Sequence, residues 1–218
     1  MKIRRIELFI PNFEETVAFY MEKLNFPLLQ KSHHKALFKI GQSTLVLHKE
    51  EKESNYYHYA INIPPNLFQE AKLWLKERTS LLLENGKDNI HFTESKAMAM
   101  YFEDPAGNIV EFISRYETST KVESTHFTPQ HMQEISEIGV STDNIHELAE
   151  KLQSMGIPVR NNEPIHYEKY LNFFGEWEDG AFIILGPLGR RWLFSEKVGI
   201  KAPVIIETDR GVVDLTNI

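Results

Sequence analysis

Three stretches of the sequence share one pattern: RIELFIPN (5–12), HYAINIPPN (58–66) and EIGVSTDN (137–144). In each stretch, alternating apolar and polar residues predict a β-strand, and the asparagine at the end predicts the start of a helix. A pattern that recurs along a chain indicates a repeated supersecondary unit. We therefore expect three copies of one strand–helix unit.

The three expected helices begin in the same way. A Glu or Gln follows each asparagine three residues later: Asn12 with Glu15, Asn66 with Gln69, and Asn144 with Glu147. The asparagine side chain can accept a hydrogen bond from a first-turn N–H, and the Glu or Gln can reach back to the cap. Apolar residues at helical spacing follow each pair, so each helix is expected to bury one face.

Further strands are expected after each helix, separated by turns that contain Gly, Asp or Pro. They lie at 36–40 and 44–49, at 98–103 and 109–114, and at 170–175 and 181–185. The repeated unit is thus βαβββ. The sequence predicts an α+β fold in which repeated βαβββ units form cupped mixed sheets.

These units suggest a division of the chain into three parts. Residues 1–115 hold a pair of units, residues 116–133 are a polar linker, and residues 134–218 hold a third unit with a C-terminal tail. The tail has expected strands at 191–194, 203–207 and 212–215. An odd number of units leaves two arrangements open. The tail completes a fourth, degenerate unit, or the third unit pairs with another chain.

Composition excludes several classes of protein. The 218 residues carry a net charge of -7, which argues against nucleic acid or an anionic membrane as a partner. The absence of cysteine excludes disulfides, thiolate catalysis and cysteine-ligated zinc. No signal-peptide pattern is present, and no apolar run approaches the roughly 20 residues of a membrane span. We therefore expect a cytoplasmic protein.

The first strand of each unit carries polar residues on one face, in the same register. These residues are Arg5 and Glu7, then His58 and Asn62, then Glu137. Because strand side chains alternate between two faces, the polar residues either meet solvent or line a shared cavity.

Two further residues are candidates for a site. Glu111 lies between Ile109 and Ile113 on its face of strand 109–114, and a carboxylate among apolar neighbours is costly unless it is paired or ligating. His48 lies on the same face as Val46, at the end of strand 44–49.

The stretch FEDPAGNIVEF (102–112) resembles the terminal-strand signature of the glyoxalase/bleomycin-resistance/dioxygenase superfamily, also called the vicinal oxygen chelate superfamily. In that signature, an Asp-Pro-x-Gly turn precedes a strand whose Glu, here Glu111, is a ligand in metal-dependent members. Phe19 and Tyr20, followed by Leu24 and Phe26, resemble the family's first helix. The resemblance covers 1–115 and, more weakly, 134–187. It implies the cupped fold and a homodimer.

In metal-dependent members of this family, the ligands come from the first and closing strands of two units. In the first two units these positions hold Arg5, Val46, His58 and Glu111; in the third unit they hold Glu137 and Ile184. The resemblance therefore implies that His58 and Glu111 bind a divalent metal, either Ni, Zn, Mn or Fe. Further ligands would come from Glu7, His48, Glu137 or water.

The family resemblance also implies a set of roles. The protein would be a lyase, an isomerase or a ring-cleaving dioxygenase that acts on a small molecule. Glu7 is the candidate general base, if it lies within hydrogen-bond reach of the substrate proton. The candidate substrate-binding residues are Arg5, His48 and Asn62.

Two other interpretations need no metal. In one, the cup binds a small molecule as a resistance protein does: Arg5 pairs with Glu111 or takes an anionic group. Apolar contacts would then come from Phe9, Tyr20, Tyr101 and Trp177. In the other, Arg5, His58 and Glu111 form a satisfied polar network without any ligand.

Overall fold

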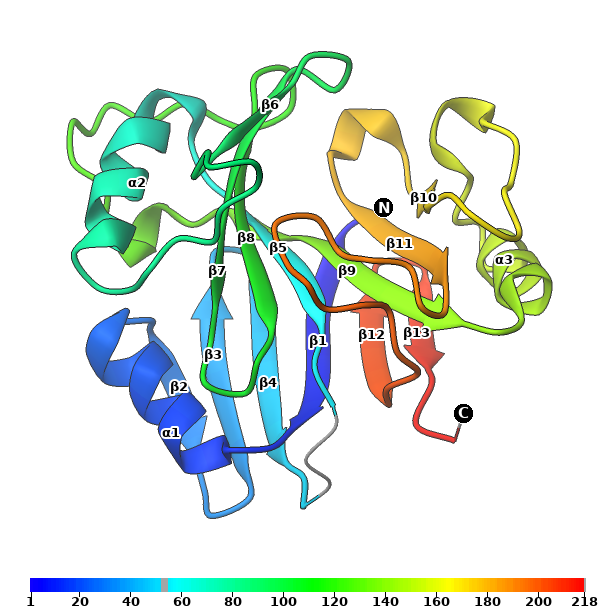
Figure 1. Ribbon diagram of the computed structural model, residues 1–218, viewed down its shortest axis with the longest axis horizontal. Coiled ribbons are helices and arrows are strands. Elements are labelled where there is room, and N and C mark those ends of the chain that lie inside the picture. Colours follow the sequence, from blue (N-terminus) through cyan, green and yellow to red (C-terminus); the bar gives the residue numbers. More distant parts are fainter. Residues whose placement is uncertain (52–54, 218) are drawn as a thin grey trace.

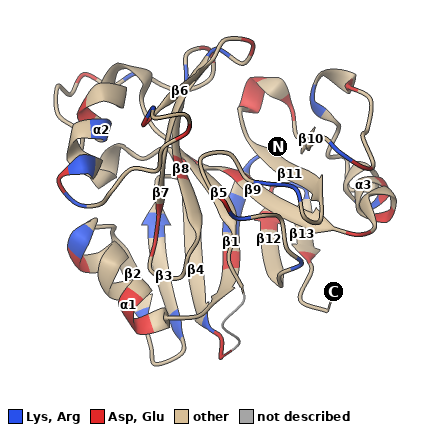
Figure 2. Ribbon diagram, in the orientation of Figure 1, with Lys and Arg blue, Asp and Glu red and all other residues tan. Residues whose placement is uncertain are grey.

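The computed structural model describes residues 1–51 and 55–217. Two curled mixed sheets form the body of the molecule (Figure 1), which confirms the predicted α+β fold of cupped sheets. One sheet has six strands, in the order β13-β12-β1-β4-β3-β2, and the other has seven, in the order β10-β11-β9-β5-β8-β7-β6. Basic and acidic positions are interspersed along both sheets (Figure 2).

The strands of the six-stranded sheet are β1 (Ile3–Ile10), β2 (Leu28–Lys31), β3 (Lys35–Ile40), β4 (Ser43–Lys49), β12 (Val204–Thr208) and β13 (Gly211–Asp214). Those of the seven-stranded sheet are β5 (His58–Asn62), β6 (Ile90–Phe92), β7 (Ala97–Glu103), β8 (Ile109–Arg115), β9 (Glu134–Thr142), β10 (Asn172–Phe174) and β11 (Phe182–Pro187). The expected strand at 191–194 is wrong, because these residues belong to a loop in which Arg191 makes an isolated bridge with Val198.

An α-helix follows the first strand of each unit, as expected. The helices are α1 (Phe13–Ala18), α2 (Phe68–Lys76) and α3 (Ile145–Ser154). A π-helical segment, η1 (Phe19–Lys23), continues α1, and single 3₁₀ turns form η2 (Pro65–Leu67), η3 (Pro129–His131), η4 (Arg160–Asn162) and η5 (Trp177–Asp179). Among the described residues, no helix has the length and apolar character to cross a membrane.

Only one of the three predicted asparagine caps forms. The Asn144 side chain accepts a hydrogen bond from the N–H of Glu147, as expected. Asn12 instead adopts a left-handed conformation with φ of 51°, and its side chain donates to the carbonyl of Pro105. The Asn66 side chain exchanges hydrogen bonds with the backbone of Val122. Both side chains are therefore used for long-range contacts rather than for capping.

Strand pairing answers the question of the odd unit. β9 of the third unit pairs antiparallel with β5 of the second, so these two units share the seven-stranded sheet. β12 of the tail pairs antiparallel with β1 of the first unit and extends the six-stranded sheet. The tail and the first unit thus share the six-stranded sheet. The division at 1–115, 116–133 and 134–218 stays a prediction about domains, and strand pairing runs across it.

The apolar faces of the two sheets meet in one core. Ile6, Leu8 and Ile10 of β1 are fully buried, as expected, and belong to the same apolar cluster as Ile138 of β9. β1 also contacts β9 directly. This shared core holds the two sheets together and leaves the opposite face of the seven-stranded sheet free to form a site.

The Asp-Pro-x-Gly turn is anchored in this core. Asp104 accepts hydrogen bonds from the backbone N–H groups of Ala106 and Asn108 and from the hydroxyl of Tyr20, at 2.6 Å. The Tyr20 and Tyr59 hydroxyl oxygens lie 2.5 Å apart. Tyr20 is fully buried here, so the expectation that it contributes to a ligand cavity is wrong.

Candidate metal centre

One imidazole and two carboxylate side chains converge on one face of the seven-stranded sheet. Ala60 of β5 is the cross-strand partner of Glu111 in β8 and also of Glu137 in β9. Paired residues point to the same side of a sheet, and so does His58, two residues before Ala60. The small Ala60 side chain leaves space between the carboxylates. Strand register alone therefore brings His58, Glu111 and Glu137 together.

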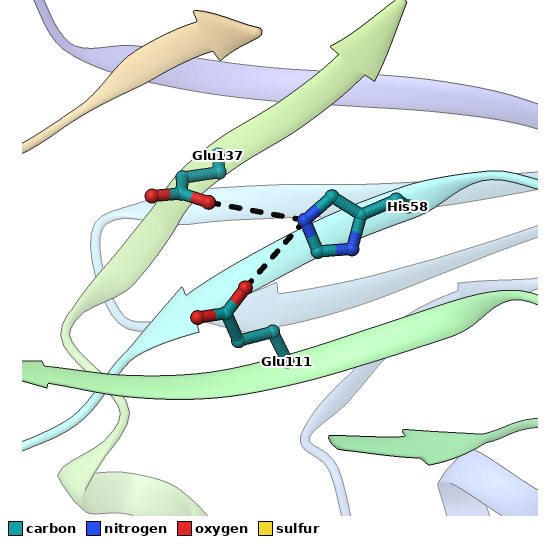
Figure 3. A group of neighbouring side chains, drawn as sticks. All are labelled: His58, Glu111 and Glu137. Carbon is teal, nitrogen blue, oxygen red and sulfur yellow. Dashed lines mark ion pairs between the residues drawn. The ribbon is translucent and has the colours of Figure 1, made fainter. Parts of the chain in front are cut away.

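The ligand atoms of these residues lie close to one another (Figure 3). The Nε2 atom of His58 is 3.5 Å from Oε2 of Glu111 and 3.8 Å from Oε2 of Glu137. One ligand atom from each residue falls within 4.8 Å of the others. The Nδ1 atom of His58 lies 3.1 Å from the carbonyl oxygen of Ile109. Because a carbonyl only accepts, Nδ1 donates this hydrogen bond, and Nε2 faces the two carboxylates.

The environments of the two carboxylates differ. Burial and the nearby Glu137 raise the pKa of Glu111. Burial also opposes the charged form of Glu137, but the charges of Arg115 and His58 outweigh it, so the pKa of Glu137 lies below its ordinary value. Arg115 holds Glu137 directly through its Nη2 atom. Among the described residues, Oε1 of Glu111 is buried without a hydrogen-bond partner. A cation at this point would satisfy that oxygen in place of a proton.

A cavity of about 930 Å³ opens from the three residues. Its aromatic lining residues are Phe92, Tyr101, Tyr170, Phe173, Trp177, Phe182 and Trp192. Ile184 of β11 also lines the cavity, at the position where the family resemblance allows a fourth ligand. Burial, together with the Glu111 and Glu137 carboxylates, raises the pKa of Tyr101, so its hydroxyl keeps its proton at neutral pH. Aromatic and apolar side chains thus line the cavity together with polar and charged ones.

A segment that we call the strap, residues 188–202 between β11 and β12, passes in front of β5 and β9 (Figure 1, orange). The Trp192 ring lies 5.0 Å from the His58 ring, and the Phe194 ring stacks on Tyr101 at 4.6 Å. A Cβ atom on Gly139 would come within 2.6 Å of Trp192. Gly139 therefore allows the strap to pack closely over the cup.

An ion pair fixes the strap to the second unit. Arg191 contacts Glu84 through two nitrogen–oxygen pairs, at 2.5 and 3.1 Å. The same carboxylate accepts a hydrogen bond from the N–H of Phe194 at 2.9 Å. The tail is thus part of the wall of the cup.

The residues predicted from the first unit lie elsewhere. Arg5, Glu7 and His48 form an ion network on the six-stranded sheet, where Glu7 is 2.6 Å from His48 and 3.0 Å from Arg5. Arg5 also pairs with Glu207 of β12, not with Glu111. In the described chain, none of the three lines the cavity. The structure therefore brings together His58 and Glu111, without the residues expected from the first unit.

Some of the remaining candidate residues line the cavity and others lie outside it. Asn62 lies on the same face of β5 as His58, at the other end of the strand, and its Oδ1 atom accepts hydrogen bonds from Arg115 and Ser119. Phe9 stacks on His48 at 4.7 Å, whereas Tyr101 and Trp177 line the cavity. Asn62 thus contacts a residue that holds Glu137.

Sequence reasoning treats Glu137 as one of several further ligands and overlooks Arg115 and Trp192. A signal for Glu137 is present, since it occupies the same place in its unit as His58 does in the second. Nothing in the sequence pattern reveals that the second and third units share a sheet.

Comparisons with known sequences found a matching family model and similar curated proteins. A family model described as toxoflavin-degrading enzyme matches residues 135–190. Metallothiol transferase FosB of Staphylococcus haemolyticus (strain JCSC1435) is 30% identical over 115 residues, which cover 50% of this chain and 80% of that protein.

Two solved structures share the fold over most of the chain. A putative dioxygenase from Bacillus subtilis subsp. subtilis str. 168 has 15% identity and a TM-score of 0.60, covering 85% of this chain and 63% of that chain. Glyoxalase I from Zea mays has 13% identity and a TM-score of 0.58, covering 84% and 66%. Fold and site together define a cupped-sheet protein with a cluster able to hold a metal. The chain belongs to the glyoxalase/bleomycin-resistance/dioxygenase superfamily.

Proposed function

We propose that this protein is a metal-dependent enzyme of the glyoxalase-like type, with lyase, isomerase or ring-cleaving dioxygenase activity on a small molecule. His58, Glu111 and Glu137 would hold one divalent ion. A donor set of nitrogen and oxygen without sulfur suits Mn, Fe, Ni or Zn. The observation that carries the proposal is a buried imidazole and two buried carboxylates around one point.

The spacing of the ligand atoms fits one ion. Two ligands at about 2.1 Å from an ion, with an angle of about 90–110° between them, lie about 3 to 3.5 Å apart. The separations of 3.5 and 3.8 Å from His58 are close to this range. The Ile109 carbonyl orients His58 and Arg115 orients Glu137, as outer partners of metal ligands do.

Three protein ligands leave coordination positions open for substrate. A divalent ion at this place supplies Lewis-acid polarisation of neighbouring substrate oxygens or activation of dioxygen. Tyr101 keeps its proton and can donate a hydrogen bond to a substrate oxygen near Glu111. Trp192 covers His58 and restricts water on that side.

One observation favours a second function, a metal-free binding or resistance protein of the same fold. Arg115 pairs with Glu137, and the raised pKa of Glu111 favours its neutral form. The cup is then close to electrically balanced without a cation. In this case the aromatic cavity would bind a small organic molecule directly.

Reconstitution tests the two functions. The protein would be loaded separately with Mn²⁺, Fe²⁺, Ni²⁺ and Zn²⁺, and supplied with catechols in air or with the hemithioacetal of methylglyoxal and glutathione. Metal-dependent product that is lost in His58→Ala and kept in His34→Ala, an exposed histidine, would support the enzyme. Ligand binding without metal uptake would support the alternative.

The homodimer implied by the family resemblance remains a prediction. In the described chain, β9 supplies Glu137 to the cup that β5 and β8 form. A second chain is not needed for these three ligands. We therefore expect one metal ion per chain at every protein concentration.

A further inference from the structure

We propose that the small-molecule ligand of this cavity carries an anionic group, a carboxylate or a phosphate-type group, which Arg190 binds. The inference rests on the proposed function, since it concerns the same cavity. It adds a substrate class and names the residue that selects it. The argument depends on how the arginines of the cavity are paired.

In the part of the chain that the structure describes, three arginines line the cavity: Arg115, Arg160 and Arg190. Arg115 is paired with Glu137. Arg160 forms two contacts of 3.0 Å with Glu163, and its guanidinium lies 4.2 Å from the centre of the Phe173 ring. Both of these cations therefore have protein partners.

Arg190 differs from the other two. Its Nη1 atom donates to the carbonyl of Arg191 at 3.0 Å, and in the described part of the chain no carboxylate oxygen lies within 4.0 Å of its guanidinium. The side chain is half-buried. Burial, and the neighbouring charge of Arg191, lower the pKa of Arg190, which nevertheless stays charged at neutral pH. A half-buried cation without a counter-charge gains most from an incoming anion.

The backbone of the strap holds Arg190 in place. The N–H of Gly199 donates to its carbonyl at 2.7 Å, and Arg191 is tied to Glu84. Two residues of chain span at most roughly 7 Å, so Arg190 starts close to Trp192, whose ring covers His58. Arg190 and the three ligands line the same cavity, so one small molecule can contact both.

The other carboxylates of the cavity do not compete for this position. Glu117 pairs with Lys96, and Glu163 pairs with Arg160. Glu94 is exposed at the rim, where water solvates it. Glu111 and Glu137 are the candidate metal ligands, so they would bind a cation rather than Arg190. Within the described residues, the cavity thus combines a candidate cation-binding end with a guanidinium that lacks a carboxylate partner, and this combination suits an anionic chelator.

The test compares catechol with 3,4-dihydroxybenzoate and 3,4-dihydroxyphenylacetate, which place a carboxylate on arms of different length. Dissociation constants would be measured by calorimetry on the Mn²⁺-loaded protein. We expect at least one of the two acids to bind about tenfold more tightly than catechol. Arg190→Gln should remove this preference, Arg190→Lys should keep part of it, and Arg160→Gln, which makes the same charge change beside a partner, should keep it.

Two results would overturn the assignment: equal binding of catechol and both acids by the wild type, or a preference that survives in Arg190→Gln. Mn²⁺ affinity, measured first, separates this failure from that of the proposed function, since Arg190→Gln should leave it unchanged. If the wild type binds no metal, benzoate and phenylphosphonate replace the catechols. Binding that Arg190→Gln abolishes would then support the anion site, and no binding by the wild type would overturn it.

Discussion

Glu111 and Glu137 face each other across Ala60, which is the cross-strand partner of both. The two carboxylates come from different βαβββ units, and the strand between them begins with His58. The candidate metal centre is therefore built where the second and third units join. The small side chain at position 60 is a requirement of this arrangement.

Ala60→Val tests that requirement. The larger side chain would enter the space between the carboxylates, and we expect divalent-metal affinity to fall at least tenfold. Ala99→Val is the matched control, because Ala99 is also fully buried on this sheet but pairs with Ile113. Metal titration of both variants measures the effect. Equal metal affinity in the two variants would show that the space above Ala60 is not the binding point.

Gly139→Ala tests the packing of the strap. The added methyl group would meet the Trp192 ring at 2.6 Å, and overpacking of this kind costs about 1–3 kcal/mol of the free energy of unfolding. Trp192→Leu in the same chain should relieve part of the cost. Urea unfolding of the two single variants and the double variant gives the coupling energy. Simple additivity would mean that the two residues do not touch.

Tyr20→Phe tests the buried network at the Asp-Pro-x-Gly turn. Removing the hydroxyl leaves Asp104 and Tyr59 without a shared partner in the core, which should cost about 1–3 kcal/mol of unfolding free energy. Tyr167→Phe, on an exposed tyrosine, should cost almost nothing. A comparable loss in both variants would indicate that the buried hydroxyl contributes little.

Glu7 should make the protein sensitive to acid. Burial opposes its charged form, but the hydrogen bond from His48 and the charges of Lys35 and Arg5 outweigh burial, so the pKa of Glu7 lies below its ordinary value of 4.5. A lowered pKa stabilises the folded state above pH 4.5, and this contribution is lost as the pH falls through the folded-state pKa.

Glu7→Gln should therefore lower the unfolding free energy at pH 7 and change it less at pH 3. Unfolding curves at both values measure the difference. A deficit in Glu7→Gln that stays the same at pH 3 would place the effect in packing rather than in charge.

Much of the fold follows from local patterns in the sequence. Strand alternation and the position of each following helix define the βαβββ units, and the buried Glu111 is evident from its apolar neighbours. Two predicted caps do not form, because Asn12 and Asn66 bond to distant backbone groups, which no local pattern records.

The candidate site is only partly evident from the sequence, because it too depends on long-range contacts. His58 and Glu111 lie in one unit, and their parallel strands β5 and β8 place them together. Long-range strand pairing decides which other unit contributes a residue to the cup. The sequence alone equally allows the first unit, which would contribute Arg5. Strand pairing makes the choice, since β1 pairs with β12 whereas β5 pairs with β9.

The central claim is that His58, Glu111 and Glu137 hold one divalent ion. Equilibrium Mn²⁺ binding, with free Mn²⁺ followed by electron paramagnetic resonance, tests it on the wild type, Glu137→Gln and Glu134→Gln. Glu134 lies in the same strand but pairs with Lys2, so it is a matched control. The account predicts one ion per chain in the wild type and in Glu134→Gln, with affinity at least tenfold weaker in Glu137→Gln. No binding by the wild type, or unchanged binding in Glu137→Gln, would contradict it.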